Sequence, residues 1–152
     1  QEAPVWTDPC EAGRNADGDE PDHAILTAVL QKHVSDGRVG DIESTLVDYE
    51  ALRRDPADLR SYLRQVCATE LQRQTNASQL ATLINAYNAW MLALVVMYAP
   101  RVSVLELHDA LPENSVWRHK FGTVGGVKVS LDDIEHQMIR GGLSAACGAQ
   151  GR

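Results

Sequence analysis

The longest apolar stretch of the chain lies at residues 80–99, where the sequence reads LATLINAYNAWMLALVVMYA. Pro100 follows it and would interrupt a helix, so the pattern predicts one long helix that ends there. Twenty mostly apolar residues would also be enough to cross a membrane. Thr82, Asn85 and Asn88 lie within the run, however, and their polar side chains favour the buried central helix of a soluble domain, with no membrane-spanning segment.

Two shorter amphipathic helices are expected before this one. Residues 23–35 carry an apolar stripe at helical spacing after Asp22, a residue type that caps helices. A second helix is expected over about residues 56–73, because Pro56 fits the first helical position. The segment 38–54 has no clear period and stays ambiguous.

The last third of the chain predicts a β-hairpin followed by a short helix. Residues 121–129 contain two β-prone triplets around a Gly-Gly turn. Ser130 then opens a helix with Asp133 three residues later, which is the spacing of a capping box. We therefore expect an α+β fold, a mostly helical single domain around a buried central helix with a small β-hairpin.

Charge is concentrated at the N-terminal end. The 152 residues carry 21 acids and 14 bases, a net charge of −7. Residues 1–22 hold seven of the acids and one base, so −6 of that charge lies there and −1 elsewhere. This pattern predicts an extended acidic tail at 1–21 and a single domain at 22–152. There is no basic stripe, so a nucleic acid partner is not expected.

The cysteines and the N-terminal residue bear on the compartment. Cys10, Cys67 and Cys147 allow one disulfide and one free thiol, with three possible pairings. At its spacing in the second helix, Cys67 fits a core thiol better than a nucleophile. Asn76 begins a sequon for N-glycosylation, and the chain starts at Gln1 with no initiator Met, as a processed product would. Together these features predict an extracytoplasmic protein, either exported or lumenal.

Two amides lie on one face of the apolar central helix. Asn85 and Asn88 are three residues apart, and a buried amide without a partner costs about 1–3 kcal/mol. Both should therefore be hydrogen-bonded. We interpret them as a structural polar clamp that holds the main chain of the loop at 101–120, or of the hairpin, against the helix. The alternative is that they orient a substrate.

A second group of polar residues lies on the predicted last helix. Glu135 and His136 are adjacent, and Asp132 is one turn before the histidine. A carboxylate beside an imidazole can poise a general base, but at this spacing a solvated ion-pair face is the better interpretation. Cys147 could serve as a nucleophile for His136. No metal-ligand spacing and no cofactor motif is present, so we expect neither a metal nor a cofactor.

Two motifs resemble those of a known family. Residues 84–89 read INAYNA and residues 130–136 read SLDDIEH, and both are similar to motifs of the family called domain of unknown function 547. That group occurs in exported bacterial proteins and in eukaryotes. The resemblance covers about residues 22–140. Residues 32–39 and 47–49 are similar to the opening motif of the family, which an apparent insertion at 40–46 splits here.

The resemblance changes after Arg140. In the family a spacer, a histidine and a strand ending in a cysteine-containing motif follow; here the spacer before Cys147 is shorter and that histidine is absent. The resemblance thus implies a domain truncated at its C-terminal end. We expect a non-catalytic interaction subunit, an accessory or stabilising component of a larger assembly, membrane-associated or soluble, whose partners are other protein subunits. The alternative is a Cys/His-dependent hydrolase or transferase, with His136 as base, Glu135 or Asp132 orienting it and Cys147 as nucleophile. Asn85 and Asn88 would then position the substrate.

Overall fold

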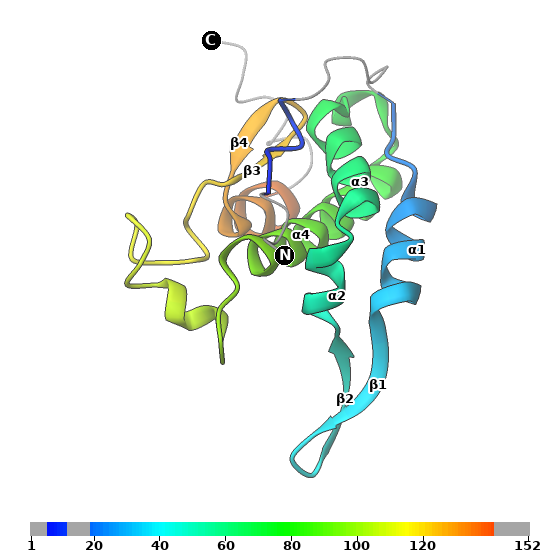
Figure 1. Ribbon diagram of the computed structural model, residues 1–152. Helices are drawn as coiled ribbons and strands as arrows, with labels where there is room; N and C mark the ends of the chain where they lie inside the picture. Colours follow the sequence, from blue (N-terminus) through cyan, green and yellow to red (C-terminus); the bar gives the residue numbers. More distant parts are fainter. Residues whose placement is uncertain (1–5, 12–18, 142–152) are drawn as a thin grey trace.

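A computed structural model describes residues 6–11 and 19–141 of the chain. Its longest element is α4 (Asn76–Tyr98), around which the other helices and the β3–β4 hairpin are arranged, while the β1–β2 hairpin projects away from it (Figure 1). The other elements are α1 (His23–His33), β1 (Val34–Val39), β2 (Ile42–Val47), α2 (Tyr49–Arg54), α3 (Ala57–Ala68), η1 (Leu71–Arg73), η2 (Val104–Leu107), β3 (Gly122–Val124), β4 (Val127–Val129) and η3 (Asp133–Ile139). The fold is α+β and mostly helical, as predicted.

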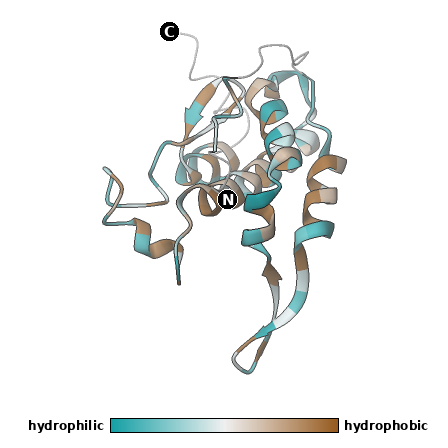
Figure 2. Cartoon of the chain, viewed as in Figure 1, coloured by the Kyte–Doolittle hydropathy of each residue, from teal (hydrophilic) through white to brown (hydrophobic). Residues whose placement is uncertain are grey.

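The core forms where α4 packs against α1, α2 and α3. Alanines at 86, 89 and 93 let neighbouring elements approach the helix closely, and Trp90 fills the space beside them. Leu59, Leu63 and Val66 of α3 are fully buried against this face. Hydrophobic and hydrophilic segments alternate along the surrounding helices, as expected for elements that bury one face only (Figure 2).

The central helix is not buried on every side. Leu80, Ile84 and Asn88 follow one another at intervals of four residues, and all three side chains are exposed. By length and composition alone α4 could cross a membrane, but more than half of its most apolar stretch is buried within the protein, as in the core helix of a soluble domain. The expectation of an all-round buried helix is therefore wrong for this stripe.

The first helix begins as predicted and ends earlier. The Asp22 carboxylate accepts the Ala24 N–H at 3.0 Å, which caps α1. The helix ends at His33, and Gly37 lies within strand β1, so it is not a stop signal. Strand β1 pairs with β2 in continuous antiparallel register from Val34↔Val47 to Val39↔Ile42. The sequence had left this second hairpin ambiguous.

The second predicted helix is also shorter than expected. It ends at Ala68, and residues after it form the short 3₁₀ helix η1. Pro56 lies at the N-cap and not at the first helical position, and its ring has no group that could accept a backbone N–H. The Asp55 carboxylate before it pairs with Lys32 Nζ at 2.5 Å. This ion pair ties the end of α1 to the start of α3.

The predicted glycine hairpin docks on the end of α3. Gly125 and Gly126 both have positive φ angles, 57° and 82°, which only glycine adopts readily. Their N–H groups donate to the carbonyls of Val66 and Cys67 at 3.1 and 2.7 Å. A Cβ atom at Gly125 would lie 2.9 Å from the Thr69 carbonyl oxygen. The β3–β4 turn thus supplies hydrogen-bond donors to two backbone carbonyls in the last turn of α3.

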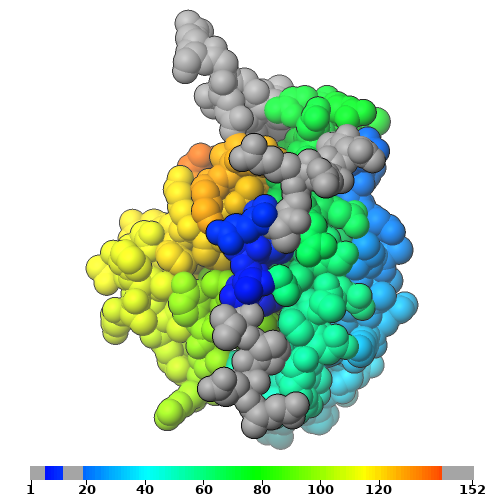
Figure 3. All heavy atoms as spheres, turned by 45° about the horizontal axis from the view of Figure 1, so that its top comes forward, coloured from blue at the N-terminus to red at the C-terminus, as the bar shows by residue number. Residues whose placement is uncertain are grey.

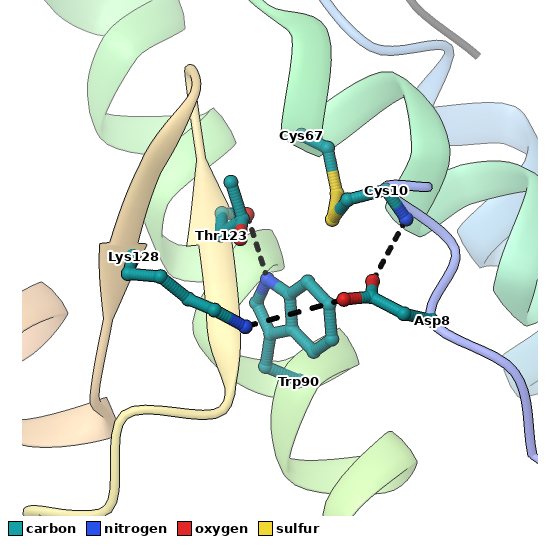
Figure 4. The surroundings of a disulfide bond; sticks show 6 residues. All are labelled: Asp8, Cys10, Cys67, Trp90, Thr123 and Lys128. Atoms are coloured by element: carbon teal, nitrogen blue, oxygen red, sulfur yellow. Dashed lines mark hydrogen bonds and ion pairs between the residues drawn. A yellow bond between two sulfur atoms is a disulfide. The ribbon is translucent and has the colours of Figure 1, made fainter. Parts of the chain in front are cut away.

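A disulfide joins the N-terminal segment to the core. Cys10 bonds to Cys67 of α3, with 5.6 Å between their Cα atoms, so Cys67 is not the core thiol predicted from its spacing. The Asp8 carboxylate accepts the Cys10 N–H at 2.9 Å and lies 4.0 Å from Lys128 Nζ (Figure 4). Residues 6–11 therefore lie between the β3–β4 hairpin and α3 (Figure 3).

Candidate functional site

The two sequence motifs meet where η3 packs against α4. Ser130 and Asp133 form a reciprocal capping box: Ser130 N–H donates to Asp133 Oδ2 at 2.8 Å, and Asp133 N–H donates to Ser130 Oγ at 3.1 Å. Ile134 is fully buried beneath this turn. The capping box and the burial of Ile134 together determine which side of η3 carries the polar residues that follow.

Tyr87 of α4 faces the acidic residues of this motif. Its side chain is half-buried, and burial raises the pKa of the phenol, with a further rise from the negative charges of Glu135 and Asp132. The charges of both carboxylates are therefore felt at the phenol. Glu135 also pairs with Arg140, with 2.7 Å between Oε1 and Nη2.

His136 lies at the outer edge of the site. Its ring is exposed, and Nε2 is 3.9 Å from Asp132 Oδ1, too far for a hydrogen bond. An exposed pair at this distance contributes little to stability. Cys147, the nucleophile of the alternative interpretation, lies outside the described residues. The described part of the chain thus holds an imidazole beside a carboxylate on an open surface.

The two amides of α4 have different environments. Asn88 is exposed, so it cannot be half of a buried clamp, and that prediction is wrong for this residue. Asn85 is half-buried and its Nδ2 lies 3.1 Å from His23 Nδ1. Asn85 does hold another element, but that element is α1, which it contacts through the side chain of His23. The prediction had named the main chain of the 101–120 loop or of the hairpin. Of the two amides, only that of Asn85 is therefore partly buried.

Asn85 belongs to a polar cluster that the sequence did not reveal. His23 Nδ1 is 2.9 Å from the hydroxyl of Tyr62, and its Nε2 is 3.3 Å from Glu20 Oε1. Because the Asn85 amide nitrogen can only donate, Nδ1 must accept, and the ring proton then lies on Nε2. Nε2 is near the Glu20 carboxylate but does not form a hydrogen bond with it. The buried hydroxyl of Tyr62, which needs a partner, was the one available signal.

Asn85 and Asn88 together provide a matched test of this cluster. Asn85→Ala should lower the free energy of unfolding by about 1 kcal/mol, because it removes a hydrogen bond in a half-buried setting. Asn88→Ala, on the same helix but exposed, should change it by less than about 0.5 kcal/mol. Urea denaturation of both variants measures the difference. Equal losses in the two variants would contradict the placement of these residues.

A pH dependence follows from Tyr62. Burial raises the pKa of its phenol, and the charge of Glu20 raises it further, above the value of about 10 in an unfolded chain. Below that pH both states hold the proton, so the stability is intact. As the pH rises above about 10 the unfolded state ionises first, and the free energy of unfolding falls.

Tyr62→Phe should therefore reduce the alkaline loss of stability, although it costs about 0.5–1.5 kcal/mol near neutral pH through the lost hydrogen bond. Tyr98→Phe, at an exposed hydroxyl near His119, is the control and should keep the alkaline loss of the unmodified protein. Urea titrations near pH 7.5 and about pH 10.5 compare the variants. An unchanged alkaline loss in Tyr62→Phe would refute the assignment.

The residues of this region that reach the surface are here called the motif face. Leu80, Ile84 and Asn88 share one side of α4 with Tyr87, because residues three, four and seven positions apart lie above one another on a helix. Asp132 and Glu135 border it beside Tyr87. The motif face is therefore those six residues, Leu80, Ile84, Tyr87, Asn88, Asp132 and Glu135.

The remaining candidates lie apart from this surface. Asn76, the glycosylation candidate, is exposed in the first turn of α4, which Thr75 caps by accepting the Ser78 N–H at 3.2 Å. Within residues 6–11 and 19–141, no group of three or more His, Cys, Asp or Glu side chains is arranged to hold a metal ion.

Comparison with known proteins places the motif face within a family domain. No curated protein and no solved structure matches the chain. Residues 71–150, more than half of the sequence, match the family described as "Protein of unknown function, DUF547". The matched region contains α4, the β3–β4 hairpin and η3, and the β1–β2 hairpin lies before it. The chain therefore belongs to the DUF547 family.

Proposed function

We propose that this protein is a non-catalytic interaction subunit that docks other protein subunits through the motif face, as an accessory or stabilising component of a larger extracytoplasmic assembly. The observation that carries the proposal is the exposure of the motif face. Ile84 is 46% exposed and Leu80 is 41% exposed, on the same side of α4 as the polar side chain of Asn88. Apolar side chains bordered by polar ones are typical of protein interfaces.

The polar chemistry of the face supports binding more than catalysis. A general base works best in a site where burial and neighbours adjust its pKa and exclude water. His136 is exposed instead, and Glu135 is already held in an ion pair with Arg140. Charged groups in such positions can set the orientation of a partner and the rate of association.

The compartment is part of the same proposal. Disulfides persist in oxidising compartments and are rare in the cytosol, and the Cys10–Cys67 bond therefore supports a secreted, periplasmic or lumenal setting. The sequon at Asn76 has its side chain exposed, which is compatible with such a setting.

Co-purification from the source cells tests the proposal. Tagged wild type and Ile84→Lys are compared with Val102→Lys, a control at a valine that is 92% exposed in another part of the surface. Proteins that co-purify in stoichiometric amounts with the wild type and the control should fall by roughly tenfold or more with Ile84→Lys, the loss expected for an interface anchor.

Two results would count against the proposal. Equal recovery of partners with Ile84→Lys would exclude the motif face as the docking surface. A wild-type protein that purifies from its compartment without any stoichiometric partner would exclude the subunit role. Unfolding midpoints of all three proteins should agree, because both substituted side chains are exposed.

A further inference from the structure

Strand β2 has an outer edge that nothing covers within the described residues. The β1–β2 hairpin projects away from the helices (Figure 1), and over residues 6–11 and 19–141 its sheet has only these two strands. Five of the six residues of β2 are exposed, and Ile42 is 71% exposed. An isolated two-stranded hairpin is marginally stable in water, so a third strand would stabilise it.

Apart from the charge of Glu43, this edge also lacks the features that normally keep strands from pairing with other chains. Natural edge strands carry prolines, lysines or bulges, or are very short. Residues 42–47 read IESTLV, with no proline and no lysine. The register with β1 runs through six consecutive pairs without a bulge. The edge is therefore suited to accept a neighbouring strand.

The hydrogen-bonding pattern shows which backbone groups are available. The Asp48 N–H donates to the His33 carbonyl at 2.8 Å, so these two residues form a hydrogen-bonded pair at the base of the hairpin. Hydrogen-bonded and non-hydrogen-bonded pairs alternate along an antiparallel ladder. From this pair toward the turn, the alternation makes Thr45 and Glu43 members of non-hydrogen-bonded pairs with β1. Their backbone N–H and C=O groups are therefore directed to the outer edge of β2.

The two faces of the hairpin differ in character. Val39, Ile42 and Leu46 lie on one face, where the Leu46 side chain covers Gly37. The other face holds the ion pair of Arg38 and Glu43, with 3.6 Å between Nη1 and Oε1. A matching strand must therefore place apolar side chains on the first face and uncharged or complementary ones on the second.

We propose that β2 pairs antiparallel with β2 of a second copy of this chain, centred on Ser44. In that register Ile42 lies opposite Leu46, Glu43 opposite Thr45, and Ser44 opposite itself. Apolar side chains meet apolar ones, and no two like charges are directly opposed. The outward groups of Glu43 and Thr45 face each other as hydrogen-bonded pairs, so the backbone pattern and the side-chain pattern require the same register.

The product is a four-stranded sheet with strand order β1–β2–β2–β1. Because the two hairpins run in opposite directions and each projects from its helices, the helical parts of the two copies lie at opposite ends of the shared sheet. One face of this sheet carries Val39, Ile42 and Leu46 from both copies. Strand β2 is only about 20 Å long, so the dimer belongs to the weak and reversible class of interfaces.

Light scattering with proline variants tests the dimer. At a concentration on the order of 100 μM, chosen because interfaces below about 1,200 Å² are weak, the wild type should approach twice the monomer mass of 16.7 kDa. Thr45→Pro removes an outward N–H of β2 and should leave a monomer. Asp36→Pro is the matched control, because Asp36 pairs with Thr45 but lies on the outer edge of β1, and it should keep the dimer.

Cysteine cross-linking tests the register. In a Cys147→Ser background with diamide as the oxidant of the two thiols, Ser44→Cys should give a covalent dimer, because residues directly opposite across a strand pair have Cβ atoms about 4.5–5.5 Å apart. Glu43→Cys, opposite Thr45 in this register, should not.

A monomeric wild type overturns the inference, and so does a dimer that Thr45→Pro leaves intact or that Ser44→Cys fails to trap. Loss of the dimer in both proline variants would assign it to the hairpin as a whole and overturn the β2 edge. The motif face takes no part in this pairing, so its co-purification test is decided independently.

Discussion

Replacing Trp90 by alanine should lower the free energy of unfolding by about 3–5 kcal/mol, the loss typical of a large aromatic residue removed from a core. Trp90 is almost completely buried in α4 and packs edge-to-face on Phe121, with 5.8 Å between ring centroids. Its indole N–H donates to the Thr123 carbonyl at 3.1 Å. One side chain therefore fills the core and fixes the β3–β4 hairpin to the central helix.

Two further variants separate these contributions. Trp90→Phe should lose less than Trp90→Ala, because it keeps most of the apolar contact but leaves the Thr123 carbonyl without its donor. Trp117→Ala, at a half-buried tryptophan, is the control and should cost less than Trp90→Ala. Urea denaturation measures all three, and a loss below about 1 kcal/mol for Trp90→Ala would contradict the packing described.

Removing the disulfide should have the second largest effect. The double variant Cys10→Ala/Cys67→Ala should lose about 2–4 kcal/mol, because the bond closes a long loop and restricts the unfolded chain. The two cysteines are 57 positions apart. Dithiothreitol should lower the stability of the wild type toward that of the double variant when unfolding is followed in urea.

The third cysteine supplies the control for this experiment. Cys147→Ala should leave the response to dithiothreitol unchanged, because Cys10 and Cys67 form the disulfide. If the wild type had the same stability with and without the reductant, the N-terminal segment would not be covalently attached, and the support for an oxidising compartment would be lost with it.

The sequence predicted best those features that local chemistry determines. The apolar run at 80–99 indicated α4, the Gly-Gly pair indicated the β3–β4 hairpin, and the spacing of Ser130 and Asp133 indicated their reciprocal hydrogen bonds. Each signal lies within a few residues, so neighbouring positions suffice to read it.

Features that depend on distant contacts were not predictable in the same way. Asn85 contacts His23, 62 positions away, and no periodicity reveals such a partner. Three cysteines allow three pairings, and only the packing of the N-terminal segment on α3 selects one of them. Asn88 was expected inside because its neighbours are apolar, but the stripe it shares with Ile84 is exposed.

The β1–β2 hairpin was missed for another reason. Strand prediction relies on a face that the protein itself buries, and this hairpin buries almost none of its side chains. Val39 is 61% exposed, and the turn at Gly40-Asp41 has a φ of 59° at the glycine. Asp36-Gly37, another turn-like pair, lies inside β1 and gives a misleading signal. A hairpin whose apolar face is not buried by its own chain gives only a weak strand pattern in a single sequence.

The central claim is that the family motifs build a docking surface and hold no catalytic Cys/His pair. The rate at which iodoacetamide alkylates Cys147 tests this claim most directly, with His136→Ala as the comparison. A thiol with the ordinary pKa of about 8.5 should react about tenfold faster for each unit of pH up to about 8, at the same rate in both proteins. Rapid alkylation near pH 6 that His136→Ala slows would show a thiolate paired with the imidazole and would contradict the account.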